Sequence, residues 1–436
     1  MKETLTPGAI EGRITAPASK SYAQRALAAA LLVPHSDDPA RWSELRNMGL
    51  CNDTSAALDV IRRLGAEVLI DRDTYRVQGG FLRQSPTELN IGEAGLSARL
   101  FTPIAAQSPR PITVTGHGSI LKRPVATTMT APLHALGATV RCTGDGYLPL
   151  TVCGPLRGGT VEVDGSLSSQ FITGLLMASP LSAEDTHLVV RQPKSIPYLA
   201  MTLEVLRAFG ISVSHAADYT EFIIRGGQQY QPATYSVEGD WSGASCLLVA
   251  GAVASAVGSG VTVDNLNPRS LQADRAMVDA LTRAGATMEQ TGHTLTVRRS
   301  ESLRGFDFDA TNCPDLFPAL AALAACCSGT TRLRGTTRLT HKESDRAATI
   351  AAEFGKLGVT IDLSQEDLMI IHGAAPALDT LRVVNPALDS HNDHRIAMAT
   401  AVAALRADRA VEIDGAEAVN KSYPGFWEDL QKLRLQ

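Results

Sequence analysis

The sequence predicts an α/β protein assembled from six similar units, and two observations carry this prediction. A helical pattern ending in glycine recurs along the 436 residues, as in IRRLGAEV and LHALGATV. Two short β-like runs around a polar turn follow it each time, as in EVLIDRDTYRVQGG. The glycines are separated by 72, 73, 75 and 73 residues, at Gly65, Gly137, Gly210, Gly285 and Gly358. Self-similarity at a fixed period indicates a repeated structural unit.

Each unit reads as strand–helix–strand–helix–strand–strand. A glycine directly after a helical run is the usual C′ residue, and D, G or N turns between alternating runs predict β-hairpins. A further strand and helix precede each helix–glycine element, which gives the alternation of an α/β fold. The repeat predicts a sixth helix near residue 431, and GFWEDLQKL at 425–433 supplies it. Coincidental glycine capping is the alternative, and the near-equal spacing argues against it.

The composition is that of a globular protein from a reducing compartment. Hydrophobic residues make up 44% of the chain and the net charge is −5, which gives no basic excess for nucleic-acid binding. The longest apolar stretch, near 246–257, is too short for a membrane span, which needs about 20 residues. The N-terminal MKETLTPGAIEGRITAP has no apolar signal-peptide core, and seven cysteines without a CxxC pattern suit the cytosol. We therefore expect a cytoplasmic protein with two or more domains and no nucleic-acid or membrane partner.

Cations stand at several predicted helix starts, where they are electrostatically unfavourable. The run NDHRIAMATAV puts Arg395 in the first turn of a helix that Asn392 or Asp393 would cap. A cation there costs about 0.3–1 kcal/mol, because the helix N-terminus carries partial positive charge. Cations in or beside other predicted starts are Lys20, Arg25, Arg99, Arg123, Lys342, Arg346 and Lys421. A solvated or snorkelling side chain explains any one of them, but the set indicates a site for phosphate or carboxylate groups.

Uncharged donors and carboxylates accompany these cations. Two further predicted helix starts carry hydrogen-bond donors: Ser168, Ser169, Gln170, Ser195 and Tyr198. Asp315, Asp345 and Asp393 each stand where a helix cap is a sufficient explanation. Glu343 in the run KESDR stands too early for that role. A carboxylate among cations is a candidate general acid or base.

Eight short motifs follow one another over nearly the whole chain. They are PASKSYAQRAL, GEAGLSAR, KRP, DGSLSSQF, PDLF, KESDR, NDHR and NKSYPGF. In this order they resemble the EPSP synthase (3-phosphoshikimate 1-carboxyvinyltransferase) family of enolpyruvyl transferases. The resemblance implies an inside-out α/β barrel fold of two similar domains, each with three βαβαββ units. It implies one domain at residues 19–238 and a second at 1–18 and 239–436, with the active site in the cleft between them.

The resemblance implies a reaction between two polyanions. The enolpyruvyl group of phosphoenolpyruvate (PEP) moves to the 5-hydroxyl of shikimate 3-phosphate, with release of phosphate, on the route to chorismate and the aromatic amino acids. The chemistry is addition and elimination through a tetrahedral intermediate, with no metal or organic cofactor, and the family is mostly monomeric. The alternative on this fold is UDP-N-acetylglucosamine 1-carboxyvinyltransferase. That relative typically has a loop cysteine before the position of Arg123, and GHGSILKRP contains none.

The resemblance also implies roles for the residues that match family motifs. The residues implied to bind PEP are Lys20, Gly95, Arg123, Gln170, Arg346, Arg395 and Lys421. The residues implied to bind shikimate 3-phosphate are Lys20, Ser21, Arg25, Ser168, Ser169, Gln170, Ser195, Tyr198, Asp315 and Lys342. Glu343 is implied to give and take the proton at the PEP methylene, and Asp315 to take the 5-hydroxyl proton. Lys20 is implied as a third catalytic residue.

Four positions depart from the commonest family pattern. These are Glu93 for Asn, Leu96 for Thr, Ile196 for Lys and Arg338 for Asn. An extra carboxylate at position 93 would repel the PEP carboxylate unless a cation pairs with it. Arg99 is the candidate partner.

Overall fold

The computed structural model describes the chain except for residues 85, 143, 301, 341, 374–379 and 435–436. The chain forms two compact units. The continuous unit is Ala18–Val237, and the terminal unit is Met1–Pro17 together with Glu238–Gln436. The domain limits expected from the sequence, at 18/19 and 238/239, lie one residue from these divisions.

The described residues of the continuous unit form three four-stranded sheets, with orders β14-β3-β5-β4, β6-β7-β9-β8 and β10-β11-β13-β12. In each sheet the first two strands are parallel and the others pair antiparallel. The strands are β3 (Ser43–Arg46), β4 (Glu67–Asp71), β5 (Thr74–Gln78), β6 (Glu88–Asn90), β7 (Ile112–Thr115), β8 (Thr139–Cys142), β9 (Leu150–Cys153), β10 (Gly159–Asp164), β11 (Thr186–Arg191), β12 (Val213–His215), β13 (Glu221–Ile224) and β14 (Thr234–Ser236). The α-helices are α1 (Lys20–Leu32), α2 (Asn52–Arg63), α3 (Gly95–Ala105), α4 (Thr130–Ala135), α5 (Gln170–Ala178) and α6 (Ile196–Ala208).

The terminal unit repeats this plan in two four-stranded sheets, of order β16-β17-β15-β2 and β18-β19-β21-β20. Its third sheet has three described strands, of order β1-β23-β22, in which β22 and β23 are parallel and β1 is antiparallel. The strands of this unit are β1 (Lys2–Leu5), β2 (Gly12–Thr15), β15 (Val261–Asp264), β16 (Thr287–Thr291), β17 (Thr294–Arg298), β18 (Asp307–Asp309), β19 (Thr330–Arg334), β20 (Thr360–Asp362), β21 (Leu368–His372), β22 (Ala387–Asp389) and β23 (Val411–Asp414). Its α-helices are α7 (Trp241–Ala254), α8 (Met277–Ala284), α9 (Phe317–Ala325), α10 (Arg346–Lys356), α11 (His394–Ala404) and α12 (Phe426–Leu433). Short 3₁₀ turns η4 (Ala273–Ala276), η5 (Pro314–Leu316) and η7 (Ala416–Lys421) connect some of them.

Strands distant in sequence complete some of the sheets. In the continuous unit, β14 from the end of the unit runs parallel to β3 near its start. In the terminal unit, β2 runs parallel to β15, and β1 pairs antiparallel with β23. Strands that are distant in sequence therefore complete sheets in both units.

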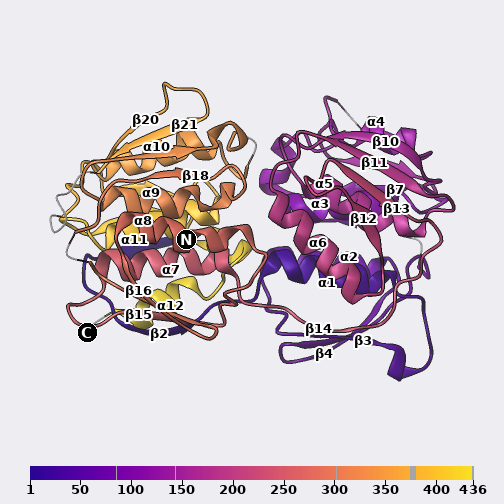
Figure 1. Ribbon diagram of the computed structural model, residues 1–436, viewed down its shortest axis with the longest axis horizontal. Coiled ribbons are helices and arrows are strands. Elements are labelled where there is room, and N and C mark those ends of the chain that lie inside the picture. Colours follow the sequence, from indigo (N-terminus) through magenta and orange to yellow (C-terminus); the bar gives the residue numbers. More distant parts are fainter. Residues whose placement is uncertain (85, 143, 301, 341, 374–379, 435–436) are drawn as a thin grey trace. The chain divides into compact units, whose positions relative to one another are not determined.

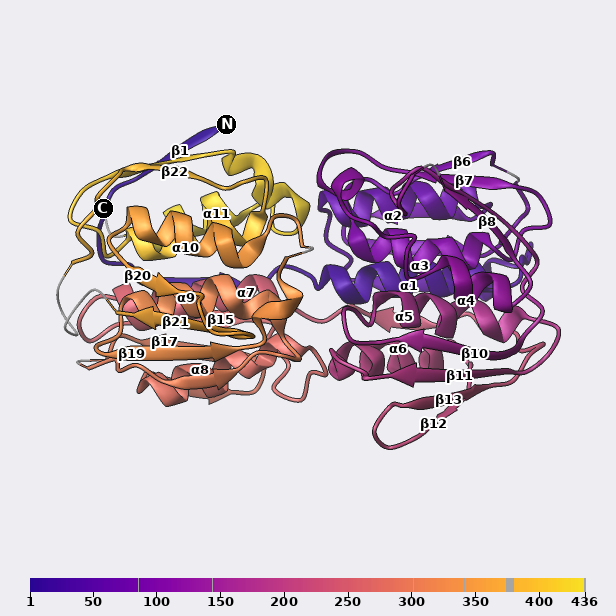
Figure 2. The same cartoon turned by 90° about the horizontal axis from the view of Figure 1, so that it is seen from above.

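The helices at the centre of each unit are enclosed by sheets, which Figure 2 shows from above. Every residue of α7, α9 and α11 is buried, as are most residues of α1, α3 and α5. Helices that are apolar all round are expected inside a core. This burial of helices within a layer of sheets is the inside-out arrangement implied by the family resemblance (Figure 1).

The structure confirms the predicted repeat elements. The five repeat glycines all have positive φ angles, between 78° and 117°, as expected of C′ residues. The predicted hairpins are the antiparallel pairs β4–β5, β8–β9, β12–β13, β16–β17 and β20–β21. The sixth predicted helix is α12.

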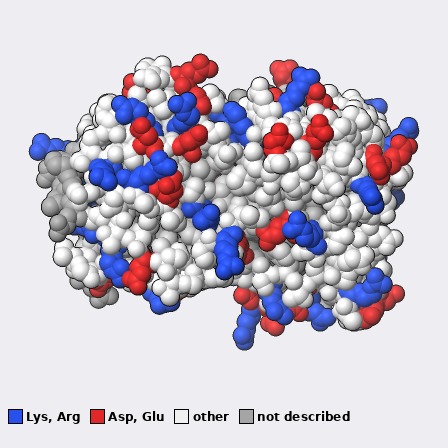
Figure 3. Space-filling model, in the orientation of Figure 1, with Lys and Arg blue, Asp and Glu red and all other residues white. Residues whose placement is uncertain are grey.

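Side chains of both charges are interspersed on the face of the protein shown in Figure 3. In the part of the chain that the structure describes, each helix is too short or too polar to cross a bilayer. The seven cysteines are free thiols.

Candidate active site

In the terminal unit, the Arg346 guanidinium holds three carboxylates. Arg346 begins α10 and is fully buried. Its Nε lies 2.9 Å from Asp393 Oδ2, its Nη1 lies 2.9 Å from Asp315 Oδ1, and its Nη2 lies 2.6 Å from Glu343 Oε2. Arg346 therefore brings the two candidate proton-transfer residues, Glu343 and Asp315, to one cation.

Asp315 is the second centre of the cluster. Besides Arg346, its carboxylate contacts Lys342 Nζ at 3.2 Å and Arg395 Nη2 at 3.1 Å. Arg395 also donates a hydrogen bond to Ser242 Oγ at the start of α7. Three cations thus converge on one carboxylate: Lys342 and Arg346 from the run KESDR, and Arg395 from the run NDHR. The cap interpretation of Asp315 is wrong, because α9 begins at Phe317 and the Asp315 side chain accepts bonds from the cations instead.

The beginning of α11 explains how Arg395 is tolerated at a helix N-terminus. Asp393 caps the helix by accepting a hydrogen bond from the Arg395 N–H at 3.0 Å, and it also pairs with Arg346. The Asn392 carbonyl oxygen accepts a 2.7 Å hydrogen bond from Lys421 Nζ. The cost of Arg395 near the helix dipole is offset by Asp315, and Asp345 caps α10 as expected.

Burial and neighbouring charges shift the pKa values of the cations in opposite directions. Burial lowers the pKa of Arg346, but Asp393, Glu343 and Asp315 outweigh it and raise that pKa above its usual range. The pKa of Arg395 is likewise raised, because Asp315 outweighs burial. The pKa of Lys342 is lowered by burial, which its ion pair with Asp315 opposes. Both guanidinium groups are therefore fixed positive charges, whereas Lys342 is a weaker base than an exposed lysine.

In the continuous unit, two predicted site residues lie on α1. Lys20 begins this helix, and its Nζ lies 2.8 Å from Asp53 Oδ2 in the first turn of α2. Arg25 is 1% exposed. Its hydrogen bonds within the described residues all end on neutral oxygens, those of Ser21 O, Thr202 Oγ1, Thr173 Oγ1 and Tyr198 O. Burial lowers the pKa of Arg25 to about 10.

The Arg25 environment favours an anionic ligand. Burying a cation is costly unless an opposite charge or several hydrogen bonds compensate it. Hydroxyl and carbonyl oxygens supply the hydrogen bonds here, but they carry no full negative charge. A phosphate or carboxylate beside Arg25 would supply that charge.

Arg123 is packed against the start of α3. It is buried, and a Cβ added to Gly95 would lie 2.8 Å from its Nη2. The Glu93 carboxylate accepts a 2.7 Å hydrogen bond from the Ser119 N–H, in the turn that precedes Arg123. Arg99, the candidate partner of Glu93, donates to Gln170 Oε1 at 3.2 Å and to the Gly95 carbonyl oxygen.

The remaining predicted donors lie at the starts of α5 and α6. Ser168 Oγ accepts a hydrogen bond from the Gln170 N–H at 3.2 Å, and the neighbouring Ser169 is buried. Ser195 precedes α6 with a left-handed φ of 55°. Its carbonyl oxygen accepts a bond from the Tyr198 N–H at 3.0 Å. Two of the variant positions lie in helices of the same continuous unit: Leu96 is buried in α3, and Ile196 begins α6.

Sequence reasoning missed several partners of the predicted residues. Asp53 binds Lys20 from 33 residues away, and Asp393 was interpreted as a cap alone. Arg338 was identified only as a variant position, yet it is buried and donates to the Thr311 carbonyl oxygen at 2.6 Å. The position of Asp393 directly before His394 and Arg395 in NDHR could have indicated that it pairs with a cation. Asp53 gave no local signal.

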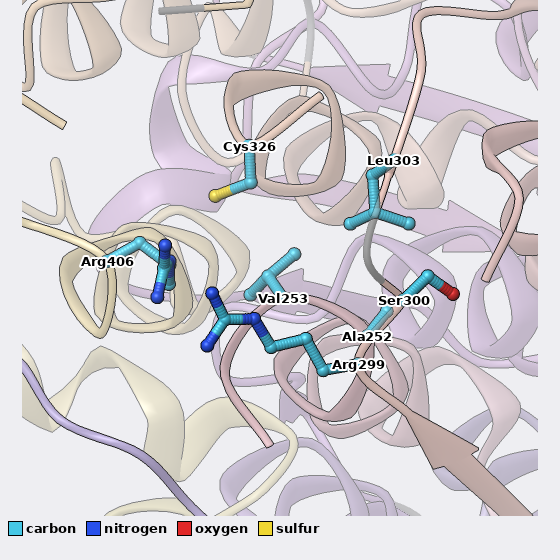
Figure 4. A pocket seen from close by; sticks show the side chains of 7 residues that line it. All are labelled: Ala252, Val253, Arg299, Ser300, Leu303, Cys326 and Arg406. Atoms are coloured by element: carbon cyan, nitrogen blue, oxygen red, sulfur yellow. The ribbon is translucent and has the colours of Figure 1, made fainter. Parts of the chain in front are cut away.

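A small cavity of about 10 Å³ lies elsewhere in the terminal unit, near the C-terminal ends of α7, α9 and α11 (Figure 4). The Arg299 and Arg406 side chains and the Cys326 sulfur surround it. Burial raises the pKa of Cys326 to about 12, so its thiol is unreactive. Cations are favourable near helix C-termini, which gives these two arginines a structural role.

Among the described residues, no group of three or more His, Cys, Asp or Glu side chains is arranged to hold a metal ion.

Comparison with known families decides between enolpyruvyl transferases and other anion-binding proteins. The model of the EPSP synthase (3-phosphoshikimate 1-carboxyvinyltransferase) family matches residues 5–430. The chain belongs to the EPSP synthase family. A 3-phosphoshikimate 1-carboxyvinyltransferase from Halobacterium salinarum is 38% identical to this family member, over 99% of each chain. One from Clostridium kluyveri is 35% identical over 99% of this chain and 96% of its own length.

Solved structures confirm the predicted fold class. EPSP synthase from Acinetobacter baumannii superimposes with a TM-score of 0.80 at 25% identity, covering 100% of this chain and 98% of its own. The enolpyruvyl transferase NikO from Streptomyces tendae gives a TM-score of 0.77 at 17% identity over 99% of this chain and 96% of its own. This EPSP synthase family member therefore has the two-domain fold of three βαβαββ units per domain.

Proposed function

We propose that the chain is a 3-phosphoshikimate 1-carboxyvinyltransferase that transfers the enolpyruvyl group of PEP to the 5-hydroxyl of shikimate 3-phosphate. The observation that carries the proposal is the convergence of Lys342, Arg346 and Arg395 on Asp315, with Glu343 on the same arginine. A reaction between two polyanions needs fixed cations, and its proton transfers need carboxylates beside them. Family membership supplies the reaction to which this arrangement is suited.

In the proposed mechanism, Glu343 protonates the methylene carbon of PEP, and C2 becomes electrophilic. The 5-hydroxyl oxygen attacks C2 while Asp315 takes its proton, and a tetrahedral phosphate adduct forms. Glu343 then removes a proton from the new methyl group as the C2–O bond to phosphate breaks. The products are the enolpyruvyl ether and phosphate. Glu343 ends protonated, as it began, and Asp315 ends with the proton of the 5-hydroxyl group, which it passes to the departing phosphate or to solvent.

The contact between Glu343 and Arg346 indicates how the acid is controlled. A cation 2.6 Å from Glu343 favours the ionised carboxylate, and an ionised carboxylate cannot donate a proton. An anionic substrate that takes up the hydrogen bonds of Arg346 would loosen this hold. Glu343 would then take up a proton from solvent as the substrate binds, and it would donate that proton to the PEP methylene.

The two units supply different parts of the proposed site. From the terminal unit we assign Asp315, Lys342, Glu343, Arg346, Arg395 and Lys421. From the continuous unit we assign Lys20, Ser21, Arg25, Gly95, Arg123, Ser168, Ser169, Gln170, Ser195 and Tyr198. We propose that both sets act on the same pair of substrates when the domains close on them. The buried charge of Arg25 supports shikimate 3-phosphate as its ligand. We also propose that the protein is cytoplasmic, because its substrates are soluble metabolites, and that it is a monomer, as the family resemblance implies.

The test is release of inorganic phosphate from PEP by the purified protein with shikimate 3-phosphate. We expect turnover with shikimate 3-phosphate and none with UDP-N-acetylglucosamine. Glu343→Gln should lower kcat by a factor of at least 100, which is the usual size of general acid–base effects, while binding of shikimate 3-phosphate persists. Glu289→Gln on the exposed strand β16 is the matched control. Folded wild-type protein that releases no phosphate would overturn the proposal.

A further inference from the structure

A buried carboxylate of α10 holds the turn that precedes α11. Glu353 is 1% exposed and lies about two helical turns after Arg346. Its Oε2 accepts a 2.9 Å hydrogen bond from the Asp389 N–H at the end of β22, and its Oε1 lies 2.8 Å from His391 Nε2. An ionised carboxylate only accepts hydrogen bonds, so His391 Nε2 is the donor. Glu353 therefore binds the turn at two points, one on the backbone and one on a side chain.

An ion pair alone does not explain the place of Glu353. Lys356 Nζ lies 2.9 Å from Oε1 and 2.8 Å from Oε2, and the lysine is partly exposed. Such an i,i+3 pair forms readily on a helix surface, where no carboxylate needs to be buried. Burying a carboxylate costs free energy unless an opposite charge and hydrogen bonds compensate it. Lys356 supplies the charge here, and the turn supplies the hydrogen bonds.

The turn has a backbone conformation that needs support. His391 and Asn392 have left-handed φ angles of 51° and 55°, which residues other than glycine adopt at a cost in free energy. The His391 N–H donates to Asp389 Oδ1 at 2.7 Å, and the Asn392 N–H donates to Ser390 Oγ at 3.2 Å. These two bonds lie within the turn, whereas Glu353 connects it to α10. A strained conformation persists only where the surrounding structure fixes it.

The turn also places partners of three cations. The Asn392 carbonyl oxygen accepts the 2.7 Å hydrogen bond from Lys421 Nζ. Asp393, the next residue, contacts Arg346 Nε at 2.9 Å and caps the helix that carries Arg395 in its first turn. A change in the conformation of the turn would therefore move groups that orient Arg346, Arg395 and Lys421.

We propose that Glu353 is a positioning residue that holds the turn 389–392 in the conformation that binds PEP. The inference rests on the proposed function, which makes Arg346, Arg395 and Lys421 ligands of PEP. When only a fraction of the molecules has the competent turn, the apparent affinity for PEP is reduced by that fraction. Saturating PEP restores the competent turn, so kcat is retained. A carboxylate that only stabilised the fold would have the opposite effect, because fewer active molecules lower kcat and leave the KM unchanged.

Steady-state phosphate release by the full-length protein, with PEP and shikimate 3-phosphate varied in turn, separates these two effects. Glu353→Gln replaces one accepting oxygen with an amide NH₂ group. We expect the KM for PEP to rise at least about tenfold, the effect of losing a hydrogen bond to a charged group. Both kcat and the KM for shikimate 3-phosphate should change less than about threefold.

Two variants of His391 keep the inference falsifiable if Glu353→Gln does not fold, because the His391 side chain is 41% exposed. His391→Leu removes the donor, and His391→Gln supplies an amide N–H near the place of Nε2. We expect the KM for PEP to rise about three- to tenfold in His391→Leu, the effect of losing an ordinary hydrogen bond. In His391→Gln it should stay within about threefold of wild type. His372→Leu, on an exposed position of β21, is the matched control and should behave as wild type.

The possible failures of the inference and of the proposed function differ. A lower kcat with an unchanged KM for PEP in Glu353→Gln and His391→Leu would overturn the inference, as would no change in either constant. Equal KM values for PEP in His391→Leu and His391→Gln would also overturn it, and the proposed function would stand. Folded wild-type protein that releases no phosphate would overturn the proposed function and the inference with it.

Discussion

Replacing Gly95 with alanine tests whether close packing at the start of α3 positions Arg123 for PEP. An ideal Cβ at residue 95 would lie 2.8 Å from Arg123 Nη2, 2.9 Å from Nη1 and 3.0 Å from Cζ. Ordinary van der Waals contact begins at 3.4 Å. The guanidinium group must therefore retreat by at least about 0.6 Å, the difference between 3.4 and 2.8 Å.

The expected magnitude follows from what Arg123 gives up. A hydrogen bond to a charged group contributes about 1.5–3 kcal/mol, and each 1.4 kcal/mol is about tenfold in affinity. Loss of one such bond predicts that the KM for PEP rises about tenfold or more. Gly95 is the first residue of α3, and alanine is the better helix former, so thermal stability should not fall.

Steady-state phosphate release with each substrate varied in turn is the assay. We expect the KM for PEP to rise in Gly95→Ala. The KM for shikimate 3-phosphate should change less than about threefold, which is the variation expected at a site that the substitution does not affect. Combining the variant with Arg123→Lys should add little, because both changes act on one guanidinium group. An unchanged KM for PEP in correctly folded Gly95→Ala would refute this account of Arg123.

Three further predictions concern buried charge. The pKa of Asp274 is raised from 3.8 to about 6, so its contribution to stability is complete below pH 3.8 and is lost as pH rises through 6. Urea unfolding should show wild type losing about 1 kcal/mol relative to Asp274→Asn between pH 5 and 7, and a pH-independent difference would contradict this. Asp393→Asn removes a partner of buried Arg346 and should cost about 3 kcal/mol or more. The exposed pair lost in Asp279→Asn should cost at most about 1 kcal/mol, and equal losses would count against the buried network. Arg25→Lys loses the forked geometry of the guanidinium group, so the KM for shikimate 3-phosphate should rise at least about tenfold. A rise in the KM for PEP alone would assign Arg25 to PEP binding instead.

The repeated elements could be predicted from the sequence because their signals are local. A helix, its C′ glycine and the hairpin behind it occupy consecutive residues, as around Gly65, and all five glycines have the expected conformation. The pairing of β1 with β23 could not be found in this way. The two strands are about 400 residues apart, and neither contains a signal for its partner.

The candidate site was predictable in its cations and less so in its carboxylates. Arg346 and Arg395 were identified because each is a cation at a predicted helix start. A cation at that place is electrostatically unfavourable, so a negatively charged partner is expected. The structure gives that partner as Asp315, which the sequence presented as a possible cap. Asp53 was missed because an acid in the first turn of a helix has an ordinary local explanation.

The central claim is that the carboxylates of this cation cluster move protons at the PEP methylene, and solvent deuterium tests it most directly. With PEP and shikimate 3-phosphate in D₂O, the account predicts deuterium on the vinyl carbon of the enolpyruvyl product by mass spectrometry, and its loss in Glu343→Gln. Phosphate release with a product free of deuterium would mean that no methyl group forms at C3, and would contradict the mechanism.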